Sequence, residues 1–226
     1  MELQKRLQTV ENRIRSACEK AGRSRDEIKI IAVTKYVGVA ETRQILAAGI
    51  TNIGENRWQV AKPKWEELAP LADWHFIGQL QTNKVKDVVG KFAYIHSLDR
   101  ISLADEIRKK AVALGITVSC FIQVNVSGEK TKSGLAPDEL SAFAKQVGAY
   151  EGIRIVGLMT MAPHVADPED ARPVFRGLRR LRDDLNRSGV LPYEANELSM
   201  GMSNDYAIAV EEGATWLRLG SVLVRG

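Results

Sequence analysis

The sequence predicts one α/β domain over residues 1–226, a closed TIM-type (β/α)8 barrel with an extra helix at its amino-terminal end. Eight short apolar segments alternate with amphipathic, helix-like segments along the chain. Such alternation is typical of a parallel sheet, and eight units within about 200 residues favour a closed barrel over an open sheet. No Gly-x-Gly-x-x-Gly motif follows the first strand, which weakens the nucleotide-binding alternative. No linker, repeat or low-complexity tract divides the chain.

The first helix is predicted by apolar residues that recur every three or four positions and therefore lie on one helical face. These residues are Leu3, Leu7, Val10, Ile14 and Cys18. Gly22 follows them and ends the helix. Because almost nothing follows the last strand, we expect this helix to cover the seam that an eighth helix covers in other barrels.

The later elements are predicted from their own composition. Runs rich in isoleucine and valine predict buried strands, amphipathic runs predict helices, and glycine or proline marks helix ends, as at Gly49, Pro70 and Gly115. The expected strands cover residues 28–34, 51–54, 74–77, 93–96, 117–124, 153–158, 195–199 and 215–219. The expected helices lie near 39–48, 57–68, 82–89, 99–114, 137–148, 168–187 and 204–212.

The charge balance does not indicate a nucleic-acid partner. The chain carries 32 basic and 28 acidic residues, which gives a net charge of +4. The densest basic stretch, Arg172–Arg187, has apolar residues at helical spacing and is interrupted by Asp183 and Asp184. We interpret it as a solvated helix face rather than a nucleic-acid contact.

The two cysteines and the amino-terminal residues indicate the cellular compartment in which we expect the protein. Cys18 and Cys120 show no metal or redox spacing, and each falls on an apolar position of an expected element. They are interpreted as small buried hydrophobes in a reducing compartment. The first residues do not resemble a signal peptide, and no apolar run reaches about 18 residues. We therefore expect a soluble, cytoplasmic protein that does not bind membranes.

Lys35 is the most informative single residue. It directly follows the apolar run 28–34, although an ammonium group resists burial. One explanation is Schiff-base chemistry, because a desolvated lysine loses its proton easily and becomes a nucleophile. The alternative is a lysine at the end of a strand whose ammonium reaches solvent.

The ends of the last two strands predict a phosphate site. Ser203 stands where an N-cap is expected, just before the helix near 204–212, and Gly201 allows close backbone approach. Gly220 and Ser221 offer a further N–H and a hydroxyl one strand later. Barrel phosphate sites often form from the loops after strands seven and eight. Taken singly, Ser203 fits a plain helix cap and Gly220 a plain turn.

Arg218 lies inside the last strand and needs a partner there, because a guanidinium cannot shed its charge. A structural partner would be Glu197. A functional partner would be a cofactor ring nitrogen, which is one way in which proteins tune pyridoxal 5′-phosphate (PLP). A lysine, a phosphate site and an arginine together indicate a binding site for that cofactor.

A resemblance to a known family covers nearly the whole chain, in order from the first strand to the last. The matching segments are Ala32–Lys35, Asn52–Asn56, Trp74–Lys84, Gln123–Asn125, Gly157–Met161, Leu198–Ser203 and Arg218–Ser221. In these segments the chain resembles the pyridoxal-phosphate homeostasis proteins, which look like a free-standing alanine-racemase barrel domain. One departure is the tail, residues 222–226, which replaces a shorter family ending.

The resemblance implies a role for each matching residue. It implies that Lys35 holds PLP as an internal aldimine and that Arg218 faces the pyridine nitrogen. It implies a phosphate site made of Ser203, Gly220 and Ser221, and a ring pocket lined by Asn56 and Met159. His75 fits a buried, hydrogen-bonded histidine as well as a chemical role, and Lys84 fits either a cation near the mouth or a solvated helix lysine.

Two functions from different classes remain. The first is a non-catalytic carrier that holds PLP and delivers it to PLP-dependent apo-enzymes. The second is a PLP-dependent amino-acid racemase, which needs acid and base groups on opposite faces of the substrate. The racemases that the barrel resembles take one of these groups from a separate β-rich domain, which this chain lacks, and an arginine at the ring nitrogen weakens the electron sink. Both points favour the carrier. Because the racemase-type dimer partly depends on the β-rich domain, we also expect a monomer. A barrel lyase that uses Lys35 on a sugar phosphate does not explain the matching segments.

Overall fold

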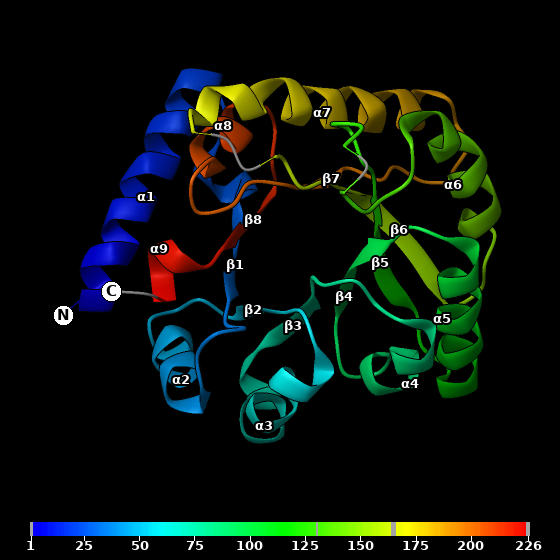
Figure 1. Cartoon of the computed structure of the whole chain (residues 1–226), viewed down its shortest axis with the longest axis horizontal. Helices are drawn as coiled ribbons and strands as arrows, with labels where there is room; N and C mark the ends of the chain where they lie inside the picture. The colour runs from blue at the N-terminus through cyan, green and yellow to red at the C-terminus, as the bar shows by residue number, and fades with distance from the viewer. Residues whose placement is uncertain (1, 130, 164–165, 225–226) are drawn as a thin grey trace.

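Eight parallel strands close into a barrel, as the sequence predicts (Figure 1). The computed structural model describes residues 2–129, 131–163 and 166–224. The strands are β1 (Lys29–Val33), β2 (Asn52–Glu55), β3 (Asp73–Phe76), β4 (Tyr94–Leu98), β5 (Val118–Gln123), β6 (Ile153–Met159), β7 (Glu197–Ser199) and β8 (Trp216–Leu219). Each strand pairs with the next, and β8 pairs with β1, so the sheet has no free edge.

Helices surround the barrel on the outside. They are α1 (Glu2–Ala21), α2 (Val39–Ala47), α3 (Trp58–Leu68), α4 (Val85–Val88), α5 (Ile101–Leu114), α6 (Leu140–Gly148), α7 (Arg172–Arg187), α8 (Tyr206–Glu211) and α9 (Ser221–Val224). The segment expected as one helix near 82–89 is a 3₁₀ turn, Thr82–Lys84, followed by the short α4. The helix α9, a single turn directly after the last strand, is not predicted by the sequence. Among the described residues, no helix combines the length and apolar character needed to cross a membrane.

The long helix α1 lies where the sequence predicts, beside α8 and α9 at the side of the barrel where β8 meets β1 (Figure 1). Val10, Ile14 and Cys18 on its inner face are buried in the main core. Arg23 follows α1 and donates hydrogen bonds to the carbonyl oxygens of Val210 (2.7 Å) and Ala214 (2.9 Å). These bonds satisfy carbonyl groups around the end of α8 and fix it to the amino-terminal helix.

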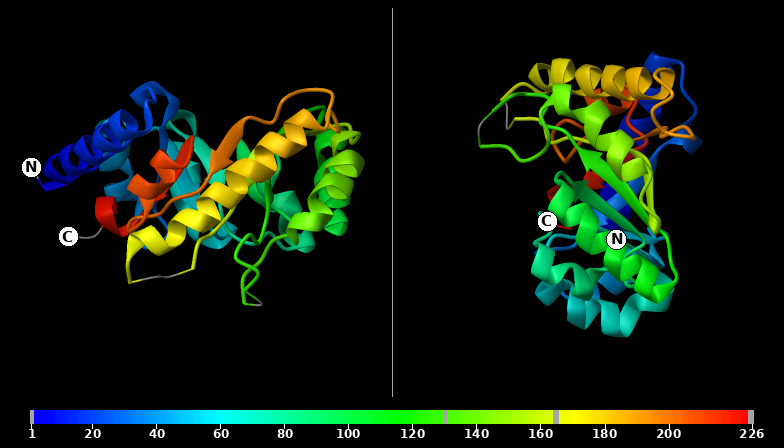
Figure 2. Two further views of the ribbon diagram at one scale, coloured as in Figure 1. Left: turned by 90° about the horizontal axis from the view of Figure 1, so that it is seen from above. Right: turned by 90° about the vertical axis from the view of Figure 1, so that its right-hand side faces the viewer.

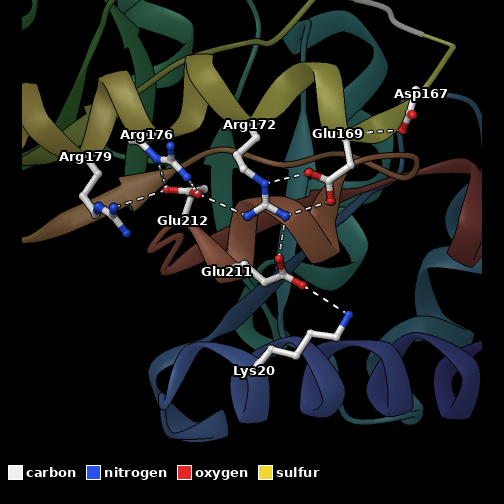
Figure 3. A network of polar contacts seen from close by, with 8 residues as sticks. All are labelled: Lys20, Asp167, Glu169, Arg172, Arg176, Arg179, Glu211 and Glu212. Atoms are coloured by element: carbon white, nitrogen blue, oxygen red, sulfur yellow. Dashed lines mark hydrogen bonds and ion pairs between the residues drawn. The ribbon is translucent and has the colours of Figure 1, made fainter.

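The arginines of α7 are more than a solvated face, which corrects the sequence interpretation (Figure 3). Glu212, just after α8, is buried, and its carboxylate pairs with Arg172 (3.1 Å), Arg176 (2.8 Å) and Arg179 (3.3 Å). Arg172 also pairs with Glu211 at 2.7 Å. Burial raises the pKa of the Glu212 carboxyl, but the hydrogen bonds from the arginines outweigh it, so the pKa lies below its usual range. The network joins α7 to α8.

We expect Glu212→Gln to lower the free energy of unfolding by about 2–3 kcal/mol at pH 7, because three arginines then lose their shared counter-charge. Since the folded-state pKa of Glu212 is lowered, its stabilisation is present above about pH 4.5 and is lost as the pH falls below that value. Urea unfolding at pH 7 and pH 4 should therefore show the variant approaching the wild type in acid. Asp184→Asn, at the exposed pair with Arg187, should change stability by less than about 0.5 kcal/mol. Equal losses in both variants would contradict the role given to the network.

Candidate functional site

A cavity of about 740 Å³ opens at the carboxyl ends of the strands. The loops that follow β5 and β6 project on one side of the barrel (Figure 2). These loops contribute Lys132, Ser133 and Pro163 to the cavity lining. Six of the seven residues expected at the site line this cavity. They are Lys35, Asn56, Ser203, Arg218, Gly220 and Ser221. A volume of this size suits a small-molecule ligand or cofactor.

Lys35 occupies a tight turn at the end of β1. The turn is closed by a hydrogen bond from the Val37 N–H to the Thr34 carbonyl oxygen, at 3.0 Å. The Lys35 side chain is half-buried, and its Nζ lies 4.9 Å from the centre of the Tyr36 ring. Within the described part of the chain, this ammonium group makes no hydrogen bond or ion pair. Its nitrogen is therefore available to a ligand in the cavity.

A buried ion pair, which was not predicted from the sequence, contacts this turn. Glu55 at the end of β2 is fully buried and pairs with Lys64 of α3, whose exposed fraction is 2%. Lys64 also donates to the carbonyl oxygens of Thr34 (2.8 Å) and Val37 (3.2 Å). A signal was present in the sequence, because Lys64 lies at helical spacing from the apolar residues at 61 and 68.

Ser203 does not cap the helix, which corrects the sequence prediction. The helix α8 begins at Tyr206, and Asp205 occupies the N-cap position. The Ser203 hydroxyl oxygen instead accepts hydrogen bonds from the backbone N–H groups of Gly220 (3.2 Å) and Val222 (3.4 Å). Two N–H donors from the segment after β8 thus converge on one oxygen atom at the cavity wall. An oxyanion is the kind of ligand that such donors bind.

Gly201 makes this arrangement possible. Its φ of +91° lies in the region that favours glycine, and an added Cβ would lie 2.6 Å from the Ala209 side chain. The loop after β7 therefore lies directly on α8, and this contact places Ser203 against the beginning of α9.

Arg218 does not pair with Glu197, so the structural alternative is wrong. Glu197 instead contacts Lys29 at 3.4 Å and accepts from the Thr215 hydroxyl. Arg218 is 4% exposed and donates to Ser199 Oγ (2.7 Å) and to the Thr160 carbonyl oxygen (2.9 Å).

Burial lowers the pKa of the Arg218 guanidinium to about 10, and the charge of Asp205 acts in the opposite direction. The hydrogen bonds that Arg218 makes within the described residues go to neutral oxygens. The cavity thus contains a buried cation that an acceptor or anion would stabilise.

The comparisons with known proteins agree with this geometry. The sequence profile of the family described as "Alanine racemase, N-terminal domain" matches residues 6–226. A protein of Aquifex aeolicus named pyridoxal phosphate homeostasis protein is 46% identical over 221 residues, which span 96% of this chain and 95% of that protein. The chain belongs to the pyridoxal phosphate homeostasis protein family. A second member, from Pseudomonas aeruginosa, is 40% identical and is matched over 93% of this chain and 90% of its own length.

Solved structures extend the comparison. PipY, the COG0325 family member of Synechococcus elongatus PCC7942, solved with PLP bound, superposes with a TM-score of 0.80 at 35% identity, covering 88% of this chain and 92% of PipY. Alanine racemase from Clostridium difficile 630 superposes with a TM-score of 0.75 at 18% identity, covering 98% of this chain and 58% of the racemase. The second likeness shows that the homeostasis proteins and the racemases share the barrel.

A chain of hydrogen bonds runs from Arg218 through the interior of this homeostasis-family barrel. Ser199 Oγ lies 2.9 Å from His96 Nδ1, and His96 Nε2 lies 2.9 Å from His75 Nδ1. His75 Nε2 lies 3.1 Å from Asn52 Oδ1. Burial lowers the pKa of His75 to about 3 and holds the pKa of His96 well below its usual value, so both rings are neutral at pH 7.

Neutral rings fix the donor at every link of this chain. Asn52 Oδ1 only accepts, so His75 carries its hydrogen on Nε2 and accepts on Nδ1. His96 therefore donates from Nε2 and accepts the Ser199 hydroxyl hydrogen on Nδ1, while Ser199 Oγ accepts from Arg218. His75 is thus a buried, hydrogen-bonded histidine, which is one of the two interpretations that the sequence leaves open.

The two histidines predict a pH dependence of stability. Because their folded-state pKa values are lowered, only the unfolded chain takes up these protons once the pH falls below about 6.5. The free energy of unfolding should therefore fall with decreasing pH, by about 1.4 kcal/mol per histidine and pH unit, until the pH reaches the folded-state pKa. Urea unfolding between pH 7 and pH 5 tests the slope, and nitrogen NMR shifts should show both rings neutral at pH 5. A ring that is protonated in the folded protein at pH 5 would contradict the donor order.

Two residues considered in the sequence analysis lie elsewhere. Met159 was expected to line the ring pocket, but it does not line the cavity and lies in a buried cluster with Ile31, Phe121 and Trp216. Met161, two residues later, lines the cavity instead. Lys84 is half-buried in its 3₁₀ turn and does not line the cavity.

Other expectations have clear outcomes. Cys18 and Cys120 are both buried free thiols, as predicted. Of the departing tail, residues 222–224 form part of α9, while residues 225 and 226 lie outside the described residues.

Proposed function

We propose that this chain binds PLP covalently through Lys35 and acts as a holder and donor of the cofactor. The observation that carries the proposal is the shared cavity of Lys35 and Arg218, an amine without a hydrogen bond and a buried cation without a contacting carboxylate among the described residues. The relatives' name and the PLP bound to PipY support the same ligand.

The described residues fit this group. The N–H groups of Gly220 and Val222 and the hydroxyls of Ser203 and Ser221 would hold the phosphate. Arg218 would donate to the ring nitrogen, and Asn56 would line the ring pocket. PLP supplies an aldehyde that reacts with an amine, and a ring that withdraws electrons.

Covalent attachment would need no further reagent. Lys35 would supply the amine for the cofactor's aldehyde carbon, and the two hydrogens of the amine would leave with the aldehyde oxygen as water. The reverse reaction with water releases the cofactor intact. A holder needs such a reversible bond.

We favour the carrier over the racemase. Arg218 is held by hydrogen bonds to neutral groups and stays charged. An arginine beside the ring nitrogen leaves that nitrogen unprotonated, and this weakens the electron-withdrawing effect of the ring that racemisation requires. The Aquifex aeolicus relative, which is matched over 95% of its length, is named a pyridoxal phosphate homeostasis protein, and this name supports the carrier. We further propose that the chain acts in the cytoplasm as a monomer and delivers PLP to apo-enzymes, and sedimentation with and without PLP tests the monomer.

The test of the function mixes PLP-loaded protein with a PLP-dependent apo-enzyme, and measures amino-acid racemisation in parallel. We expect borohydride to fix the cofactor on Lys35, the apo-enzyme to gain activity, and racemisation to stay at background. Steady racemisation would support the alternative function. A protein that yields no reducible adduct after incubation with PLP would overturn both.

A further inference from the structure

We infer that Lys64, held by Glu55, is a positioning residue that fixes the turn carrying Lys35 and thereby aims the Lys35 amine at its ligand. The inference rests on the proposed function and assigns a role to two residues that do not line the cavity. Burying the charges of Glu55 and Lys64 costs free energy, because two charges removed from water are stable only when their hydrogen bonds are well satisfied.

Lys64 uses all three of its ammonium hydrogens on the turn and its support. One goes to Glu55 Oε1, one to the carbonyl oxygen of Thr34 at 2.8 Å, and one to the carbonyl oxygen of Val37 at 3.2 Å. Thr34 and Val37 are the first and last residues of the turn. A single cation thus holds both ends of the four residues that contain Lys35.

Glu55 completes the attachment from the sheet. Its Oε1 also accepts the Thr34 hydroxyl, and the Thr34 N–H donates to the Gly54 carbonyl oxygen at 3.1 Å. Its second oxygen, Oε2, is buried without a hydrogen-bond partner. An apolar pair would avoid that cost, so the charged pair is better explained by the orientation that it imposes than by stability.

Lys35 itself is held only weakly by its own side-chain contacts. Its ammonium contacts the ring of Tyr36, which is 67% exposed, and makes no hydrogen bond within the described residues. The direction of the amine therefore depends on the turn. A misplacement of a reacting group by about 1 Å can slow a reaction about 100-fold.

The test compares Glu55→Gln/Lys64→Met with the wild type. This double variant removes both charges together and leaves an acceptor for Thr34, so no unpaired charge stays buried and the protein should fold. Lys64→Met alone leaves Glu55 buried and unpaired. If it fails to fold, the double variant carries the test. Lys62→Met is the matched control, because Lys62 lies in the same helix in an exposed pair with Glu66, at 3.7 Å.

The first readout needs no cofactor. Hydrogen exchange of the Val37 amide reports the turn, and we expect it to rise about tenfold or more in the double variant while the amides of β1 stay unchanged. The second readout is the rate at which PLP forms its borohydride-reducible bond with Lys35, which we expect to fall about tenfold or more. Affinity for pyridoxine 5′-phosphate, which has an alcohol in place of the aldehyde, should stay the same.

The outcomes are separable. Unchanged Val37 exchange, or faster exchange with an unchanged rate of bond formation, would overturn the positioning role. Equal effects of Lys62→Met would overturn it as well. If the wild type itself forms no reducible bond with PLP, the proposed function fails, while the exchange experiment still decides whether Lys64 holds the turn.

Discussion

Lys35→Ala is expected to abolish covalent capture of PLP and to leave the fold intact. The side chain is half-buried and makes no hydrogen bond within the described residues, so its loss should change the free energy of unfolding by less than about 0.5 kcal/mol. Alanine has no nucleophile to replace the amine. Borohydride treatment followed by peptide mass analysis should find no pyridoxyl group at position 35, whereas the wild type should be labelled stoichiometrically.

The control for this variant is Lys84→Ala. Lys84 is also a half-buried lysine, but it does not line the cavity, so its variant should be labelled as the wild type is. Collapse of Lys35→Ala during purification would mean that the lysine is structural. Full labelling of another residue in that variant would move the site of covalent attachment away from Lys35.

Arg218→Met is expected to weaken PLP binding about ten- to hundredfold, because a hydrogen bond to a charged group contributes about 1.5–3 kcal/mol. Methionine fills similar space without the charge. The stability of the unloaded protein should change by less than about 2 kcal/mol, since the loss of two hydrogen bonds is offset by the removal of a buried cation. Titration of PLP by absorbance measures the affinity, and urea unfolding measures the stability.

Arg218→Lys separates charge from geometry. Lysine keeps a cation in the cavity but lacks the planar fork that reaches Ser199 and Thr160 at once. We expect it to recover only part of the affinity. Full recovery would show that charge alone is required, and unchanged affinity in Arg218→Met would contradict a contact between this residue and the cofactor.

Local patterns in the sequence were enough to predict the barrel and most of its cavity. Alternating apolar segments located all eight strands, with boundaries within two residues of those observed. The position of Lys35 at the end of a strand predicted that it lies at the cavity, because the carboxyl ends of barrel strands meet there. These features depend on spacing along the chain, and spacing is visible without a structure.

The predictions from the sequence that were wrong or missing concern contacts between segments far apart in the chain. Ser203 has the right residue type for a helix cap, but Asp205 takes that position and Ser203 bonds to the segment after β8. The partners of Arg218 come from β7 and from the end of β6, and nothing near it in the sequence indicates them. Met159 is buried inside the barrel whereas Met161, two residues later, lines the cavity, and the sequence does not distinguish the two positions. The pair of Glu55 and Lys64 likewise forms only when α3 packs on β2.

The ordered donors between Arg218 and Asn52 give the protein a built-in reporter of cavity occupancy. Ser199, His96 and His75 each accept one hydrogen bond and donate one, so a ligand that accepts a hydrogen bond from Arg218 weakens its donation to Ser199 and alters every later link in the same direction. The ring of His75 lies in the barrel interior, stacked on Tyr94, and does not line the cavity. Its nitrogen resonances should nevertheless shift when the cavity is filled, so that loading and unloading can be followed in real time without a label on the cofactor.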